Sequence, residues 1–328
     1  MGYSTQYQTC PNQLVFAFVD NHMSSDWSCA EPDLSTILEQ HRAPLDSLAE
    51  GTIPAIVLRQ VFHPSWCQQL IDRLIEQQLL YDPRRPVTAQ FREAAIPEGY
   101  YREGTSLEPS YAWPDKEQTG RARIDVGTSL GYRGSDKDAF LRHSAETIAL
   151  FEKLFPDPSQ DPIRLLYRHL QTLSRDKRVE TAYELDGRRY GPAIIRAHYG
   201  GYSYKPHFDS VRLREKRTEY TVHAFEHQFA GVLVLQNTCL GDQTAQCILH
   251  RQLWQPEIDQ VLKAGKFHDY AKENRIENVR VCLEPGDLYF FNTRSIHEVP
   301  GLAGELPRIV LASFVGYSSD RDEIFVWS

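Results

Sequence analysis

The pattern of apolar positions changes near residue 190 of this 328-residue chain. Before that point, apolar residues recur at helical spacing, as at Leu70, Ile71 and Leu74, and short apolar runs predict two strands. Ser135 stands where the second helix should begin and is its expected cap. We expect helices over residues 63–80, 135–155 and 161–175, and strands over residues 53–62 and 122–127.

After residue 190 the apolar residues form short runs that are rich in β-branched side chains and separated by turn residues. Several short strands at such spacing predict a sandwich or a barrel. We therefore expect an α+β fold, in which a helical N-terminal part supports a C-terminal β-sandwich. The expected strands cover residues 192–199, 229–237, 246–253, 279–287, 288–293 and 308–318.

Three regions are expected along the chain. Residues 1–50 are polar and should form an extension that packs onto the main body, while residues 51–190 form a helical and irregular supporting region. Residues 191–328 form the β-rich core and share one structural domain with the supporting region. The stretches 83–133 and 210–228 are expected to be long loops that form a lid over a bound substrate.

Composition and charge narrow the class of protein. The formal net charge is −8, which disfavours nucleic-acid binding, and the richest basic run, residues 212–217, is expected to be a solvated loop. No segment approaches the roughly 20 apolar residues that span a bilayer, and the first residues lack a secretory signal. The six cysteines show no paired spacing. We expect a cytoplasmic protein with free thiols, whose oligomeric state the sequence does not indicate.

Four residues carry the candidate chemistry. His207 and Asp209 stand two residues apart, so in an extended chain both side chains point to one face. His297 follows a later pair of apolar runs, and Arg308 stands eleven residues beyond it, at the start of a strand. Two histidines and one carboxylate on one face of an octahedral ion are typical of a non-haem Fe(II) oxygenase.

The open face of such an ion would hold a 2-oxo acid and O₂. The distal carboxylate of the 2-oxo acid requires a planar cation with several donors, a role that suits Arg308. In the alternative, a non-catalytic β-sandwich that binds a small ligand, His207 and Asp209 hydrogen-bond in a turn and Arg308 pairs with Glu305.

A second metal motif competes with this interpretation. His223, Glu226 and His227 match H-x-x-E-H, the pattern of inverted zinc peptidases, which requires both histidines on one helix. The surrounding residues are rich in β-branched side chains, which disfavours that helix. Otherwise the two histidines are expected in a loop over the mouth of the site, where they contact substrate.

The stretches "RAHYGGYSYKPHFDS", "VCLEPGDLYFFNTRSIHEV" and "PRIVLASFVGYS" resemble the core of Fe(II)/2-oxoglutarate-dependent oxygenases. Within that superfamily, "GGYSYKPHFD" is similar to the prolyl 4-hydroxylase-like branch. The segments "IPAIVLRQVFHPSW" and "GYSSDRDEIFVWS" resemble freestanding cyanobacterial halogenases that act on indole alkaloids, in patches over residues 50–328. The resemblance implies a double-stranded β-helix core, of the jelly-roll or cupin-like kind, buttressed by N-terminal helices. It also implies Fe(II), O₂ and the cosubstrate 2-oxoglutarate.

The resemblance implies roles for individual residues. His207, Asp209 and His297 would bind iron, and Arg308 would bind the C5 carboxylate of 2-oxoglutarate. Tyr204 and Asn292 match positions near the cosubstrate or substrate. Arg196 and His198 lie on the strand that enters the site and would contact substrate if they face inward, although structural roles stay open for both.

One position departs from the halogenases. They carry a glycine where the metal-binding carboxylate would stand, which leaves room for chloride on iron, whereas this chain has Asp209. The resemblance therefore implies hydroxylation of an unactivated C–H bond, with 2-oxoglutarate converted to succinate. The expected substrate is a small molecule, such as an amino acid or a natural-product intermediate. A prolyl or peptidyl hydroxylase is the alternative within the superfamily.

Overall fold

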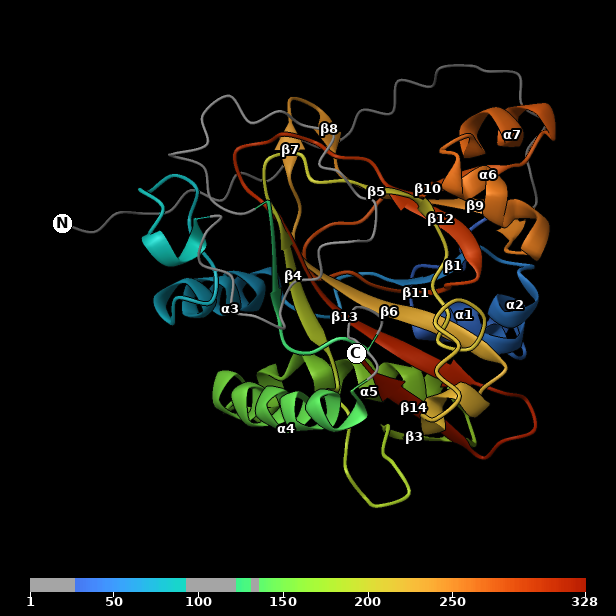
Figure 1. Ribbon diagram of the computed structural model, residues 1–328, viewed down its shortest axis with the longest axis horizontal. Coiled ribbons are helices and arrows are strands. Elements are labelled where there is room, and N and C mark those ends of the chain that lie inside the picture. Colours follow the sequence, from blue (N-terminus) through green and yellow to red (C-terminus); the bar gives the residue numbers. More distant parts are fainter. Residues whose placement is uncertain (1–26, 93–121, 131–135) are drawn as a thin grey trace.

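The computed structural model describes residues 27–92, 122–130 and 136–328. It mixes helices and sheets, as the expected α+β class requires, and Figure 1 shows helices α4 and α5 along one side of a long, twisted sheet. The α-helices are α1 (Leu34–Gln40), α2 (Pro44–Glu50), α3 (Pro64–Glu76), α4 (Lys137–Leu154), α5 (Pro162–Ser174), α6 (Asp259–Lys263) and α7 (Phe267–Glu273). The 3-10 helices are η1 (Ala89–Phe91), η4 (Pro158–Gln160), η5 (Thr221–Ala224) and η6 (Pro256–Ile258).

Two sheets and one small hairpin hold the strands. The large sheet has eight strands in the order β1-β11-β6-β13-β14-β3, with β4 also paired to β13 and β2 to β4. These strands are β1 (Ala55–Leu58), β2 (Arg123–Val126), β3 (Arg178–Thr181), β4 (Ile194–His198), β6 (His227–Gln236), β11 (Leu288–Asn292), β13 (Arg308–Tyr317) and β14 (Glu323–Trp327). The small sheet has the order β10-β9-β12-β5, and β7 (Cys239–Leu240) pairs with β8 (Gln243–Thr244). Its strands are β5 (Tyr204–His207), β9 (Cys247–Leu253), β10 (Asn278–Val281) and β12 (Ser295–Val299).

Apolar residues cover both faces of the large sheet. On one face a cluster, here named the helix-side cluster, joins the sheet to α3 and α5. Its members include Leu74, Leu166, Leu233, Phe290 and Leu311. On the other face the inter-sheet cluster joins the large sheet to the small one, and its members include Val232, Phe291, Val310, Leu249, Val281 and Val299. The two sheets therefore face each other, with the helices behind the large one.

The outer face of the small sheet is covered by α6 and α7, which Figure 1 shows beside β9, β10 and β12. A third cluster, the outer cluster, fills this contact, and its members include Phe208, Ile258, Phe267 and Ile296. The small sheet is thus buried on both faces, and successive residues of β12 point alternately into the inter-sheet space and toward α7.

Helix ends follow the capping chemistry of the sequence, with one correction. Asp136, not Ser135, caps α4, because its carboxylate accepts a hydrogen bond from the backbone N–H of Ala139. Ser135 itself lies outside the described residues. At α5, Asp161 accepts from the N–H groups of Ile163 and Arg164, just before Pro162 begins the helix.

Several elements differ from their expected bounds. The run expected as a strand over 279–287 ends at Val281, because a turn through Gly286 follows. Gly286 has φ +97°, and a Cβ there would lie 2.1 Å from the carbonyl oxygen of Phe62, so a side chain is excluded. Strands β5, β12 and β14 and the short helices α6 and α7 were not expected.

The described part of the N-terminal region packs onto the main body. Residues 27–50 contain α1 and α2, whose Ile37 and Leu48 are fully buried in the helix-side cluster. Residues 1–26 of the expected extension and residues 93–121 of the expected first loop lie outside the described residues. None of the described helices combines the length and the apolar character that a membrane span requires.

Candidate active site

Two neighbouring strands of the small sheet bring the candidate ligands together. His207, the last residue of β5, stands directly opposite His297 of β12, and their ring centroids are 4.2 Å apart. Asp209 stands two residues after the end of β5. Its N–H donates to the carbonyl oxygen of Thr293 (2.9 Å), and the Thr293 hydroxyl donates to the carbonyl oxygen of Asp209 (2.8 Å). Thr293 lies between β11 and β12, so the carboxylate is fixed to the hairpin that precedes His297.

The ligand atoms of this triad converge without bonding to one another. Oδ2 of Asp209 lies 3.7 Å from Nε2 of His207 and 3.7 Å from Nε2 of His297. Each Nδ1 faces a backbone carbonyl oxygen, that of Lys205 at 2.7 Å and that of Ser295 at 2.8 Å. Because a carbonyl oxygen only accepts hydrogen bonds, each Nδ1 carries a proton, and in the neutral ring Nε2 then presents its lone pair. In the described part of the chain, no other three His, Cys, Asp or Glu side chains meet in this way.

The local electrostatics favour the protonation states that a metal needs. Burial, and next to it the neighbouring His297, lower the pKa of His207 to about 4. Burial opposes ionisation of Asp209, but the contacts with His297 and His207 and the charge of Arg214 outweigh it and hold the pKa of Asp209 well below its usual range. At neutral pH the site therefore offers a neutral imidazole and a carboxylate, which suit a divalent cation.

Arg308 lies in the space between the sheets. It opens β13 opposite His198 of β4 and is 5% exposed. It alternates with Ile309, a member of the helix-side cluster, so its side chain points inward. The salt bridges among the described residues do not include Arg308, and the expected alternative pairing with Glu305 is not formed.

The hydroxyl of Tyr289 is the polar group beside Arg308. Burial raises the pKa of Tyr289 well above its usual value, the neighbouring Cys247 raises it further, and Arg308 opposes both effects. Tyr289 is 2% exposed and lies in the inter-sheet cluster. The sequence did not identify Tyr289 as a site residue, because an aromatic residue in an apolar strand is usually part of the core.

Tyr204, Arg196 and His198 also face the inter-sheet space. The Tyr204 hydroxyl lies 3.1 Å from Nε2 of His198, and the Tyr204 ring centroid lies 5.7 Å from that of His207. Burial, and then the charge of Arg308, hold the pKa of His198 well below its usual value, so His198 is neutral. Arg196 lies 3.9 Å from a carboxylate oxygen of Asp125. These residues form the wall that runs from the triad toward Arg308.

Asn292 does not belong to this space, which corrects the sequence-based expectation. It shares a face of β11 with Phe290 of the helix-side cluster. Its amide nitrogen donates to the carbonyl oxygens of Leu48 (3.1 Å) and Ala49 (3.2 Å) at the end of α2. Asn292 thus anchors a helix behind the large sheet.

The helix required by a zinc peptidase is not formed. His223 lies in the 3-10 helix η5, whereas His227 is the first residue of strand β6. The ring of His227 packs beside Phe229 and Tyr317 of the helix-side cluster, with centroids 6.5 and 6.4 Å away. His227 therefore lies outside the inter-sheet space, and the expected contact with substrate is not supported for it.

One residue that sequence reasoning missed touches the triad directly. Nη1 of Arg214 lies 3.1 Å from Oδ1 of Asp209. Arg214 belongs to the basic run 212–217, expected to be a solvated loop, and its side chain is indeed 38% exposed. The sequence did not predict the contact between Arg214 and Asp209, because a run of charged residues usually lies in solvent. The short separation of the two residues in the sequence is the one feature that could have indicated it.

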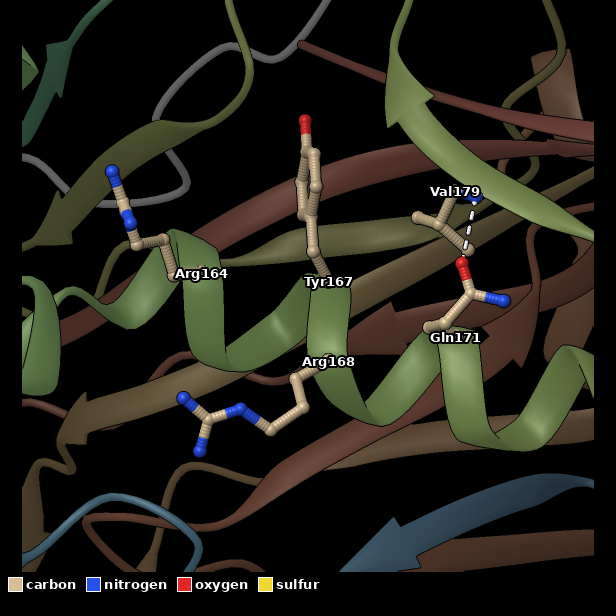
Figure 2. A pocket seen from close by; sticks show the side chains of 5 residues that line it. All are labelled: Arg164, Tyr167, Arg168, Gln171 and Val179. Atoms are coloured by element: carbon tan, nitrogen blue, oxygen red, sulfur yellow. Dashed lines mark hydrogen bonds between the residues drawn. The ribbon is translucent and has the colours of Figure 1, made fainter.

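A cavity of about 390 Å³ lies elsewhere, between α5 and β3 (Figure 2). It is lined by Arg164, Tyr167, Arg168, Gln171 and Val179. In Figure 2 the side chains of Arg164 and Arg168 point in different directions, so their charges do not converge on one ligand position. Because α5 packs on the helix side of the large sheet, that sheet separates the cavity from His297.

A family model described as "Carrier-protein-independent halogenase WelO5" matches residues 102–328. Among solved structures, an N-substituted L-amino acid dioxygenase from Burkholderia ambifaria AMMD, in complex with alpha-KG, is 15% identical. It covers 88% of this chain and 91% of its own, with a TM-score of 0.45. A search of curated proteins gave no match.

Two further solved structures are similar at the same level. The non-heme alpha ketoglutarate dependent epimerase SnoN from nogalamycin biosynthesis is 11% identical over 86% of each chain, with a TM-score of 0.43. HygX from Streptomyces hygroscopicus, with nickel and 2-oxoglutarate bound, is 12% identical over 84% of this chain and 88% of its own, with a TM-score of 0.40.

The family model spans more than half of the chain and includes all three triad residues and Arg308. It confirms the resemblance to freestanding halogenases of the Fe(II)/2-oxoglutarate oxygenase superfamily. With that resemblance, the expected dependence on Fe(II) and 2-oxoglutarate is confirmed too. This chain belongs to the carrier-protein-independent halogenase WelO5 family.

Proposed function

We propose that this chain is an Fe(II)/2-oxoglutarate-dependent dioxygenase that hydroxylates an unactivated C–H bond of a small molecule, such as an amino acid or a natural-product intermediate. The observation that carries the proposal is the convergence of Asp209 Oδ2 with Nε2 of His207 and of His297, at 3.7 Å from each. Family membership supports the cofactor and cosubstrate, and the carboxylate supports hydroxylation over halogenation.

The donor set fits Fe(II). Two neutral imidazoles and one carboxylate on one side of an ion are typical of non-haem iron oxygenases. The separation of 3.7 Å leaves space between the donor atoms, and no hydrogen bond closes it. Bound iron would supply the oxidative decarboxylation of 2-oxoglutarate and the oxidation of the C–H bond, chemistry that no amino-acid side chain performs.

We also propose that the two facing sheets form a double-stranded β-helix. The support is the inter-sheet cluster, in which β9, β10 and β12 of the small sheet pack against β6, β11 and β13 of the large one. In this arrangement the ligands on β5 and β12 open toward the space between the sheets, where Arg308 and Tyr204 lie.

Arg308 is the proposed partner of the C5 carboxylate of 2-oxoglutarate. A buried guanidinium without an anion is unfavourable, and none of the described carboxylates pairs with this one. A dicarboxylate that reaches from the triad into the inter-sheet space would supply the missing charge, with the Tyr289 hydroxyl beside it.

Asp209 distinguishes the proposed reaction from halogenation. Its carboxylate is ionised and points at both imidazoles, so it fills the position that a halide would need. The protein then orients 2-oxoglutarate and substrate and excludes water, while hydroxylation follows from the absence of a bound halide. The family description names halogenases, so the nature of the product is the point to test.

The first test is an anaerobic titration with Fe(II) and 2-oxoglutarate, followed through the weak metal-to-ligand charge-transfer absorption in the visible region. The wild-type protein should develop this absorption, and its absence would contradict the proposal. His207→Ala should lose this absorption, because it removes a proposed ligand. An unchanged band in that variant would mean that the ligand assignment is wrong.

The second test concerns substrate and product. Under O₂, candidate amino acids, alkaloid-like intermediates and proline-containing peptides are compared for succinate formed above the level without substrate. We expect small molecules to stimulate succinate and to gain one oxygen atom, even with excess chloride present. Stimulation by peptides alone would favour a peptidyl hydroxylase, and a chlorinated product would overturn the proposed reaction.

A further inference from the structure

We propose that Arg214 is a positioning residue that holds Asp209 as a one-oxygen metal ligand. The inference rests on the function proposed above, because it concerns the carboxylate that replaces the glycine of the halogenases. It assigns a role to a residue outside the triad, in a loop that the sequence presents as a solvated run of charges.

The two oxygens of Asp209 have different partners. Oδ2 faces Nε2 of His207 and of His297, at 3.7 Å from each. Oδ1 accepts a hydrogen bond from Nη1 of Arg214 at 3.1 Å. A carboxylate can bind a cation through one oxygen or through both, and a charge-assisted bond to one oxygen selects the first mode.

The chain places Arg214 through a tight turn directly after Asp209. The hydroxyl of Ser210 accepts from the N–H of Leu213 (3.0 Å), and the carbonyl oxygen of Ser210 accepts from the N–H of Arg214 (3.0 Å). The same Nη1 that bonds Asp209 also donates to the carbonyl oxygen of Phe208 at 2.8 Å. The backbone on both sides of Asp209 therefore holds Arg214, at Ser210 through the main chain of Arg214 and at Phe208 through its guanidinium.

The packing beneath this loop fixes it further. The guanidinium of Arg214 lies 5.9 Å from the ring centroid of Phe208, which stacks on Trp254 at 4.4 Å. Trp254 in turn donates its indole N–H to Asp259 of α6 (2.8 Å). The Arg214 side chain is 38% exposed, but it packs against the outer cluster, so its position is fixed.

The consequence concerns how well the metal site is preorganised. If Oδ1 were free, the carboxylate could turn away from the position in which Oδ2 faces both imidazoles, and metal binding would then have to order it again. Groups that orient a metal ligand typically contribute about 10–100-fold to metal affinity or activity. Arg214 contacts the triad through Asp209, so we expect it to act on the metal only through that carboxylate.

The test is direct binding of Mn(II) to the full chain, without 2-oxoglutarate or substrate, followed by the electron paramagnetic resonance of the free ion. Arg214→Ala should weaken Mn(II) by about 10–100-fold. Arg214→Lys, which keeps the charge, should restore part of the loss. Arg212→Ala is the matched control, because it removes the same charge from the same exposed loop and should bind as the wild type does.

The background of Asp209→Gly separates positioning from general stability. There, adding Arg214→Ala should leave Mn(II) affinity unchanged, since the group on which Arg214 acts is gone. An equal loss in both backgrounds, or wild-type affinity in Arg214→Ala, would overturn the proposal. If Arg214→Ala does not fold by circular dichroism, Arg214→Gln takes its place, with the same loss expected. A wild type that binds Mn(II) but lacks the 2-oxoglutarate absorption would instead contradict the proposed function.

Discussion

The small sheet carries two clusters of the same composition, one on each face. Each consists of two histidines and one carboxylate. They are His207, Asp209 and His297 on the inner face, and His250, Glu298 and His268 on the outer face. His297 and Glu298 are neighbours in β12, so one strand contributes to both clusters with adjacent residues.

The clusters differ in what their nitrogen atoms contact. On the inner face the backbone occupies each Nδ1 and leaves each Nε2 open toward a carboxylate 3.7 Å away. On the outer face Nε2 of His250 and of His268 lie 3.0 and 3.3 Å from the two oxygens of Glu298. Among the described residues only the inner three meet the geometry of a metal site. Residue type alone therefore does not make the site, because the backbone carbonyls decide which nitrogen is free.

The two clusters should differ most when one histidine is removed from each. His297→Ala should weaken Mn(II) binding strongly and abolish the formation of succinate, because it removes a proposed ligand. His250→Ala should keep both, although it leaves the buried Glu298 with the exposed His268 alone. Mn(II) titration and succinate measurement on the two variants check this, and loss of binding in His250→Ala would show that the outer cluster takes part.

The carboxylates should differ as much as the histidines. Asp209→Gly should lose hydroxylation and make room for a halide, so that chlorinated product appears in the presence of chloride. The wild type and Glu298→Gly should give none, since both retain Asp209. Mass spectrometry of the product distinguishes these outcomes, and chlorination by the wild type would mean that Asp209 does not exclude halide.

Much of this arrangement could be predicted from the sequence. The helices over 63–80, 135–155 and 161–175 and most core strands appear close to their expected places, because their apolar periodicity and caps are local signals. The convergence of His207, Asp209 and His297 agrees with the expected ligand set, which rested on strand alternation and on the resemblance. The short helices α6 and α7 escaped detection, because segments of five and seven residues have too little periodicity.

The errors have physical reasons as well. The strand that ends in Asn292 is apolar on both faces, because helices cover one side and the small sheet the other. Without alternation, the sequence gives no indication of which face Asn292 occupies. Arg214 was missed for the opposite reason, since a run of charges usually marks solvent and only the fold brings Arg214 to Asp209.

A smaller effect is expected from the charge of the outer cluster. Glu298→Gln keeps the shape of the side chain and removes the charge that both histidines contact. The amide can still accept a hydrogen bond from His250, so only the difference between a charged bond (about 1.5–3 kcal/mol) and a neutral one (about 0.5–1.5 kcal/mol) is lost. The free energy of unfolding should therefore fall by about 1–1.5 kcal/mol. Urea denaturation measures the loss, while Mn(II) affinity should remain that of the wild type. A loss of affinity with unchanged stability would contradict the structural role of the outer cluster.

The smallest expected effect lies behind the large sheet, where Asn292→Ala tests a residue that the sequence placed at the site. The substitution removes the two hydrogen bonds to the carbonyl oxygens of Leu48 and Ala49, which hold the end of α2, and the bond that Oδ1 accepts from the N–H of Arg294. These carbonyls end a helix at which Gly51 already donates its N–H to Leu48, so part of their bonding persists. We expect the free energy of unfolding to fall by about 1 kcal/mol, with unchanged Mn(II) affinity and 2-oxoglutarate absorption. A variant that folds normally but loses the 2-oxoglutarate absorption would show that Asn292 supports the site, through cosubstrate or through its bond to Arg294 in the hairpin before His297.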